Sequence, residues 1–109
     1  MTSSLIYSAT PISTHDTSTG DQPVEVTVSN TGQEYSHLIN VITSYSGDPA
    51  TAKLTIKSAS TIIYEADITV SGHVSHDVCG LQTERGEDLT VTLAAGGSGV
   101  QGKVNIIRQ

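Results

Sequence analysis

The chain has 109 residues, of which 36% are hydrophobic, and its formal net charge at pH 7 is −6. A chain of this length builds one hydrophobic core, and five basic residues are too few for nonspecific nucleic-acid binding, which requires Lys and Arg to neutralise phosphates. No apolar run is long enough to span a membrane, no basic segment marks a signal peptide, and the single cysteine, Cys79, excludes an intramolecular disulfide.

The first 23 residues are predicted to form an N-terminal segment distinct from the β domain at residues 24–109. Residues 4–8 predict a short strand. Residues 10–23 are rich in Ser, Thr, Pro and Gly, which indicates a polar loop or an arm that becomes ordered on a neighbouring molecule.

The middle of the chain predicts a series of short strands. Valine at every second position predicts a strand at residues 24–28, closed by turn residues. Residues 37–45 are apolar at both parities, which is typical of a strand that is central in its sheet or covered on both sides. A hairpin follows, with strands at residues 53–57 and 62–70 around a turn at residues 58–60, and its second strand places Ile62, Tyr64, Ala66, Ile68 and Val70 on one face.

The last third predicts three more strands. Val74 and Val78 indicate a strand after Gly72, a loop is expected at residues 81–86, and two strands at residues 88–94 and 100–107 flank a glycine turn. Strands recur about every ten residues, with no sustained helical period, as expected of a sandwich or barrel. The predicted fold is all-β: a small, antiparallel, jelly-roll-like β-sandwich. Because its core contains no Phe or Trp, we expect it to gain from burial in an oligomer.

Two sequence motifs of enzymes were considered, and the chain satisfies neither. Residues 97–102 match G-x-G-x-x-G, but a strand pattern follows where dinucleotide binding requires a helix. The nucleophile elbow G-x-S-x-G does not occur. The sequence therefore predicts no catalytic residue, no cofactor site and no enzymatic activity.

Two segments contain metal-ligand types. His73, His76 and Cys79 include zinc ligands, but on a strand His73 and Cys79 face opposite to His76, so His15 or His37 would have to complete a site. Residues 16–21 offer oxygen ligands for calcium without matching an EF-hand loop. We expect no metal site.

Carbohydrate binding is an alternative function, because small sandwiches often bind sugars through an aromatic ring. Trp is absent, so Tyr7, Tyr35 and Tyr45 are the candidates, whereas Tyr64 falls in an apolar row and is expected to be buried. Two exposed tyrosines side by side, with a carboxylate or amide between them, would favour this function.

The pattern over residues 52–107 resembles small virion proteins of tailed bacteriophages, including capsid decoration (cement) proteins and head, neck or tail accessory proteins. The similarity lies in a lysine-bearing strand, the hairpin at residues 56–64, the run at residues 67–72, and residues 89–104 with their glycine turn. It implies a compact β-sandwich or jelly-roll-like fold and a non-enzymatic role on the capsid exterior. The implied partner is the major capsid protein, whose neighbouring subunits the protein, often a trimer, would bridge.

We expect such an oligomer to form through apolar side chains outside the core. In the β domain, the candidates on predicted solvent parity are Ile39, Ile63 and Ile107. In the N-terminal segment they are Leu5, Ile6 and Tyr7. Burial between the two sheets is the alternative for each of these residues, and the interface hypothesis predicts contiguous exposed apolar surface.

Overall fold

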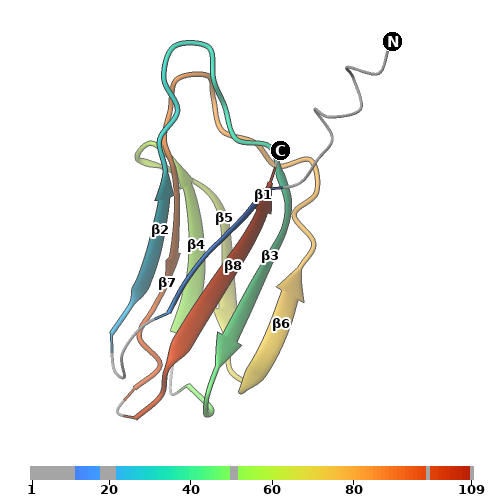
Figure 1. Ribbon diagram of the computed structural model, residues 1–109. Helices are drawn as coiled ribbons and strands as arrows, with labels where there is room; N and C mark the ends of the chain where they lie inside the picture. Colours follow the sequence, from blue (N-terminus) through green and yellow to red (C-terminus); the bar gives the residue numbers. More distant parts are fainter. Residues whose placement is uncertain (1–11, 18–21, 50–51, 98, 109) are drawn as a thin grey trace.

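The computed structural model describes residues 12–17, 22–49, 52–97 and 99–108. It contains eight strands in two antiparallel sheets (Figure 1). Sheet A has the strand order β1-β8-β3-β6, with β1 Ile12–Thr17, β8 Gly102–Arg108, β3 Leu38–Tyr45 and β6 Gly72–His76. Sheet B has the order β2-β7-β4-β5, with β2 Val24–Val28, β7 Leu89–Leu93, β4 Ala52–Ser58 and β5 Thr61–Ile68. The described residues contain no helix, and therefore none long and apolar enough to cross a membrane.

The predicted fold class is confirmed. Every connection passes from one sheet to the other except the β4–β5 hairpin, so the chain wraps around the core as in an eight-stranded jelly roll. Alternate side chains of both sheets meet between the layers. The core cluster consists of Val24, Val26, Leu38, Val41, Tyr45, Ala52, Leu54, Ile56, Ile68, Val78, Leu89, Val91, Leu93, Val104 and Ile106.

Tyr45 is the only aromatic side chain in this cluster, and two glycines make room for its ring. A Cβ on Gly96 would lie 2.8 Å from the ring of Tyr45, and one on Gly102 would lie 3.3 Å from it. The Tyr45 hydroxyl donates a hydrogen bond to the carbonyl of Ala94, and burial raises the pKa of Tyr45 to about 12. The backbone at Gly96 and Gly102 thus lies close to the Tyr45 ring, which helps to fill a core that contains few aromatic residues.

One segment expected to be a loop contains a strand. Residues 10–23 were predicted to be a polar loop or arm, but Ile12–Thr17 forms β1 and pairs along its full length with β8, from Ile12 opposite Arg108 to Thr17 opposite Lys103. Because these residues carry little apolar alternation, their sequence gives no strand signal, and only the pairing with β8 identifies β1. The strand predicted at residues 4–8 lies outside the described residues.

Two β-bulges explain why apolar residues occur at both parities. In β3, Leu38 is opposite Arg108 and Asn40 is opposite Ile107, so Ile39 is the extra residue. In β5, Ile56 is opposite Tyr64 and Lys57 is opposite Ile62, so Ile63 is the extra residue. A bulge shifts the alternation of a strand by one residue. The central position of β3, between β8 and β6, agrees with the prediction.

The bulge in β5 overturns the single apolar face that was predicted for this strand. Ile62, before the bulge, is 50% exposed, whereas Ile68, after it, is buried. Val70 lies beyond the end of β5 and is 54% exposed. Ile63 was expected on the solvent side but packs against the core. The next strand also differs: β6 ends at His76, and Val78 is buried in the loop that follows it.

Candidate functional site

The predicted interface residues of the β domain do not all share one surface. Ile39, Ile42 and Ile107 are half-buried. None of the three is among the half-buried apolar residues that pack against the core. Leu5, Ile6 and Tyr7 lie outside the described residues. Ile63 packs against the core, so the prediction that its side chain lies on the solvent side of the strand was wrong. The interface roles of all six residues remain predictions.

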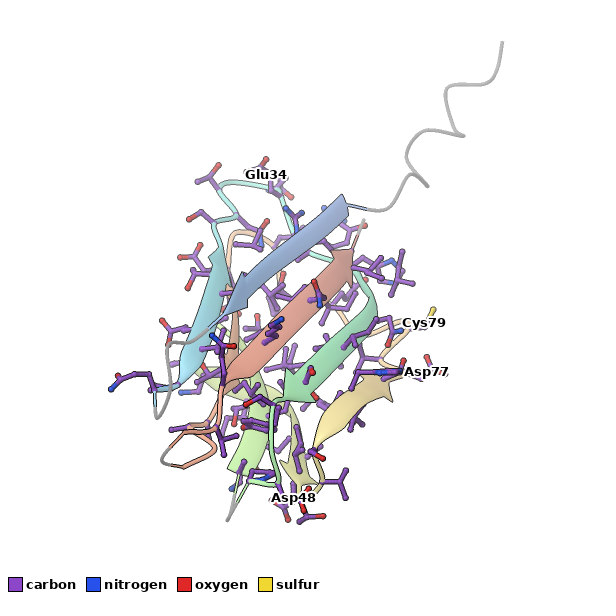
Figure 2. All side chains as sticks on the ribbon, turned by 60° about the horizontal axis from the view of Figure 1, so that its bottom comes forward. Glu34, Asp48, Asp77 and Cys79 are labelled. Atoms are coloured by element: carbon purple, nitrogen blue, oxygen red, sulfur yellow. The ribbon has the colours of Figure 1, made fainter. Side chains whose placement is uncertain are left out.

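The pairing of β3 with β8 places Ile42 and Ile107 near one another on the outer face of sheet A, and the bulged residue Ile39 precedes Asn40 on the same strand. We call these three isoleucines the sheet A patch. Ile107 is opposite Asn40, and Ile42 is opposite Asn105, so the isoleucines alternate with polar residues across the β3–β8 pair. Asn40 is also bonded to β6, where its amide nitrogen donates to Ser75 Oγ at 2.9 Å. Figure 2 looks onto this face, with β1, β8, β3 and β6 in front.

Within the part of the chain that the structure describes, the exposed apolar side chains do not form the contiguous surface that was predicted. Among the described residues, the large apolar side chains classed as exposed are Tyr35, Ile62 and Val70, which lie in a loop, at the start of β5 and between β5 and β6. The residues of the sheet A patch are half-buried rather than exposed.

The residues that suggested a metal site do not converge. His73 is exposed on the outer face of sheet A, whereas His76 is buried between the sheets with its Nε2 atom 3.1 Å from Thr43 Oγ1. Burial lowers the pKa of His76. Cys79 and Asp77 are exposed in the loop after β6, as Figure 2 shows. No group of three potential metal ligands occurs in the part of the chain that the structure describes, and residues 18–21 of the calcium candidate lie outside it.

Among the tyrosines that the structure describes, no two are exposed side by side. Tyr45 is buried, and Tyr64 is half-buried with its ring centroid 6.2 Å from that of His76. Tyr64 lines a hollow of about 300 Å³ beside the loop at residues 77–81. Tyr35 is 41% exposed and lies elsewhere, in the loop between β2 and β3.

Tyr35 contributes to a second hollow, of about 270 Å³, which the sequence did not predict and which we call the loop-end hollow. Its other lining residues are Gln82, Thr83, Glu84 and Arg85. The guanidinium carbon of Arg85 lies 5.0 Å from the centroid of the Tyr35 ring, within range of a cation–π interaction. The two loops that build this hollow run side by side at the upper end of the molecule in Figure 1.

Buried polar side chains join these two loops. The backbone N–H of Ser36 donates to Thr83 Oγ1 at 3.0 Å, and the N–H of Thr83 donates to the Ser36 carbonyl, also at 3.0 Å. The amide of Asn30 donates to Ser36 Oγ and to the carbonyl of Glu87. Because buried polar groups that are fully paired rigidify a structure, this network fixes the shape of the hollow. The sequence showed two polar loops here, and only the strand order reveals that they meet.

Comparisons with models of protein families and with curated protein sequences give no match. Among solved structures, the chain is similar to a protein called PirA, with 11% identity over 89% of this chain and 93% of that chain and a TM-score of 0.54. This likeness supports the fold alone.

Two other similar structures have TM-scores below 0.5. The SPBc2 prophage-derived protein YomS has 11% identity, covers 91% of this chain and 96% of its own, and has a TM-score of 0.44. The fucose-binding module SpX-3 of Streptococcus pneumoniae has 14% identity, covers 87% of this chain and 72% of its own, and has a TM-score of 0.49. The similar structures thus include a prophage-derived protein and a carbohydrate-binding module.

Proposed function

We propose that this chain is a non-enzymatic structural protein of a tailed-phage virion, a decoration protein that binds the capsid exterior and bridges major capsid subunits. The sequence resemblance over residues 52–107 supports the proposal, and so does the jelly-roll fold, which occurs in viral capsid domains. A position at the head–neck junction or on the tail is the alternative within the same class.

The observation that carries the proposal is the sheet A patch. Ile42 and Ile107 lie on the outer face of sheet A, where the other outward residues of β3, β8 and β6 are polar, and Ile39 is the bulged residue next to Asn40. None of the three isoleucines packs against the core. Burying such side chains against a second copy contributes about 25 cal/mol per Å² of apolar surface. The patch is adjacent to the start of β1, where Ile12 is opposite Arg108. Leu5, Ile6 and Tyr7 precede that point in the sequence and are proposed to extend the contact.

A trimer built in this way would suit a capsid, which repeats one epitope many times. A symmetric oligomer can engage several copies at once and gains avidity without large individual contacts.

Virion composition tests this proposal. Phage particles from the strain that carries the gene are purified on a density gradient, and their proteins are quantified by mass spectrometry. We expect the chain in a fixed, high ratio to the major capsid protein, and accessible to antibody on intact heads. A few copies per particle, confined to the tail, would support the tail alternative. Absence from purified particles would contradict a virion role.

A further inference from the structure

We propose that the loop-end hollow binds a neutral sugar residue. This inference does not rest on the virion role, since it concerns a different surface. The hollow is concave, with a volume of about 270 Å³, close to the lower end of the range of small-molecule sites, about 300–1,000 Å³. That size suits the end of a glycan.

The lining side chains supply both kinds of hydrogen-bonding group. The amide of Gln82 can donate and accept, the carboxylate of Glu84 accepts, and the guanidinium of Arg85 donates. Sugar hydroxyls also donate and accept, so each can pair with any of these groups. Because Glu84 and Arg85 carry opposite charges, the lining offers no net charge to attract an ionic ligand. A neutral, hydroxyl-rich ligand therefore fits best.

Tyr35 supplies the apolar surface that a sugar ring needs. Its side chain is exposed, and the guanidinium of Arg85 lies over one face of the ring and fixes its orientation. Arg85 is itself held, because its Nη1 donates to the carbonyl of Gln33 at 3.2 Å. A ring positioned before the ligand arrives loses little conformational entropy on binding.

The hollow is built from backbone that is fixed from beneath. Ser36 and Thr83 are buried and bond to one another through both of their backbone N–H groups, as described above. The N–H of Gly86 donates to the carbonyl of Glu34 at 2.7 Å. Gly86 has a φ of +78°, and a Cβ there would lie 2.9 Å from the carbonyl oxygen of Gly32. The close approach of the two loops therefore requires glycine at position 86.

The loop that carries Glu84 is also fastened to sheet B. Ser58 Oγ, at the end of β4, donates to Glu87 Oε1, and the N–H of Glu84 donates to Ser58 Oγ at 3.1 Å. The loop that lines the hollow is therefore hydrogen-bonded to a strand of the sandwich, and such anchoring holds a binding site in a fixed geometry before the ligand binds.

The test is an NMR titration of the ¹⁵N-labelled full chain with the methyl glycosides of glucose, galactose, mannose, fucose and N-acetylglucosamine. Each is added to about 50 mM, enough to detect millimolar affinity. We expect at least one glycoside to give saturable shifts confined to the amides of residues 33–36 and 82–86. No saturable shift with any of the five, or shifts centred elsewhere, would overturn the proposal.

Variants assign the binding to the hollow. Tyr35→Ala and Glu84→Ala should each raise the Kd at least about tenfold, which corresponds to about 1.4 kcal/mol, whereas Tyr35→Phe, which keeps the ring, should bind nearly as well as the wild type. Glu65→Ala, the same change at an exposed carboxylate of β5, is the matched control and should have no effect. Unchanged affinity in a folded Tyr35→Ala variant would exclude this site.

Discussion

Ala59 holds a backbone conformation that its side chain disfavours. It has a φ of +52° and is the one non-glycine with positive φ among the described residues, at the turn between β4 and β5. An L-residue in this region costs about 1–2 kcal/mol, although glycine loses about 0.5–1 kcal/mol more entropy on folding. Ala59→Gly should therefore raise the free energy of unfolding by about 0.5–1 kcal/mol, measured by urea denaturation.

The neighbouring residue provides a control for this prediction. Ser60 lies in the same turn without a positive φ, so Ser60→Gly should give no stabilisation. Equal effects of the two substitutions would show that strain at Ala59 is not the cause.

His76 makes stability depend on pH. Its imidazole is buried between Thr43 of β3 and Tyr64 of β5, and burial lowers its pKa below the ordinary value of 6.5. Protons therefore bind the unfolded chain more readily than the folded one, so the contribution of His76 is fully present above pH 6.5 and is lost as the pH falls towards the lowered value. The free energy of unfolding should decrease between pH 7 and pH 5.

Two histidine variants test this assignment in urea denaturation series across that pH range. His76→Gln, whose amide can still bond to Thr43, should show a smaller decrease than the wild type. His73→Gln, at an exposed position of the same strand, should retain the full decrease. The opposite ranking would refute the role of His76.

At the scale of elements, the bulge in β3 leads to a prediction about deletions. Ile39 is the extra residue, so the core positions of this strand are 38, 41, 43 and 45. Deleting Ile39 restores regular alternation and keeps Leu38 opposite Arg108 and Asn40 opposite Ile107. The deletion variant should remain folded, with a melting temperature within about 10 °C of the wild type, equivalent to about 1–2 kcal/mol.

Deletion of Ile42 is the matched control. Ile42 belongs to the regular part of β3, so its loss would turn either Leu38 and Val41 or Thr43 and Tyr45 to the outer face. Circular dichroism should show this variant to be unfolded. A folded Ile42 deletion, or an unfolded Ile39 deletion, would contradict the register described here.

The elements also show how far the sequence determines the structure. β2 was predicted with its observed bounds, and β4, β5, β7 and β8 within a few residues, because alternating apolar residues identify a strand with one buried face. β3 was also predicted within a few residues, but from a run that is apolar at both parities. The bulges could not be predicted, because one extra residue in a strand produces the same sequence pattern as a strand with two apolar faces. The loop-end hollow depends on long-range pairing between residues such as Ser36 and Thr83, which no local pattern encodes.

At the scale of the whole molecule, the core cluster contains one aromatic side chain, and the three isoleucines of the sheet A patch do not pack against that core. Three chains of 11.4 kDa would give an assembly of about 34 kDa. If the sheet A patch forms the contact, a polar residue that keeps strand propensity should weaken assembly without unfolding the chain. Ile107→Thr is such a change, since Thr is enriched in strands. Ile62→Thr is the same change on sheet B, at a position 50% exposed.

The most direct test of self-association through the sheet A patch is the molar mass in solution, measured by light scattering over a range of concentrations. The wild type and Ile62→Thr should have a mass of about 34 kDa, the sum of three 11.4 kDa chains, and Ile107→Thr should shift towards 11.4 kDa. A wild-type monomer at every concentration, or an Ile107→Thr variant that assembles as the wild type does, would contradict self-association through the outer face of sheet A.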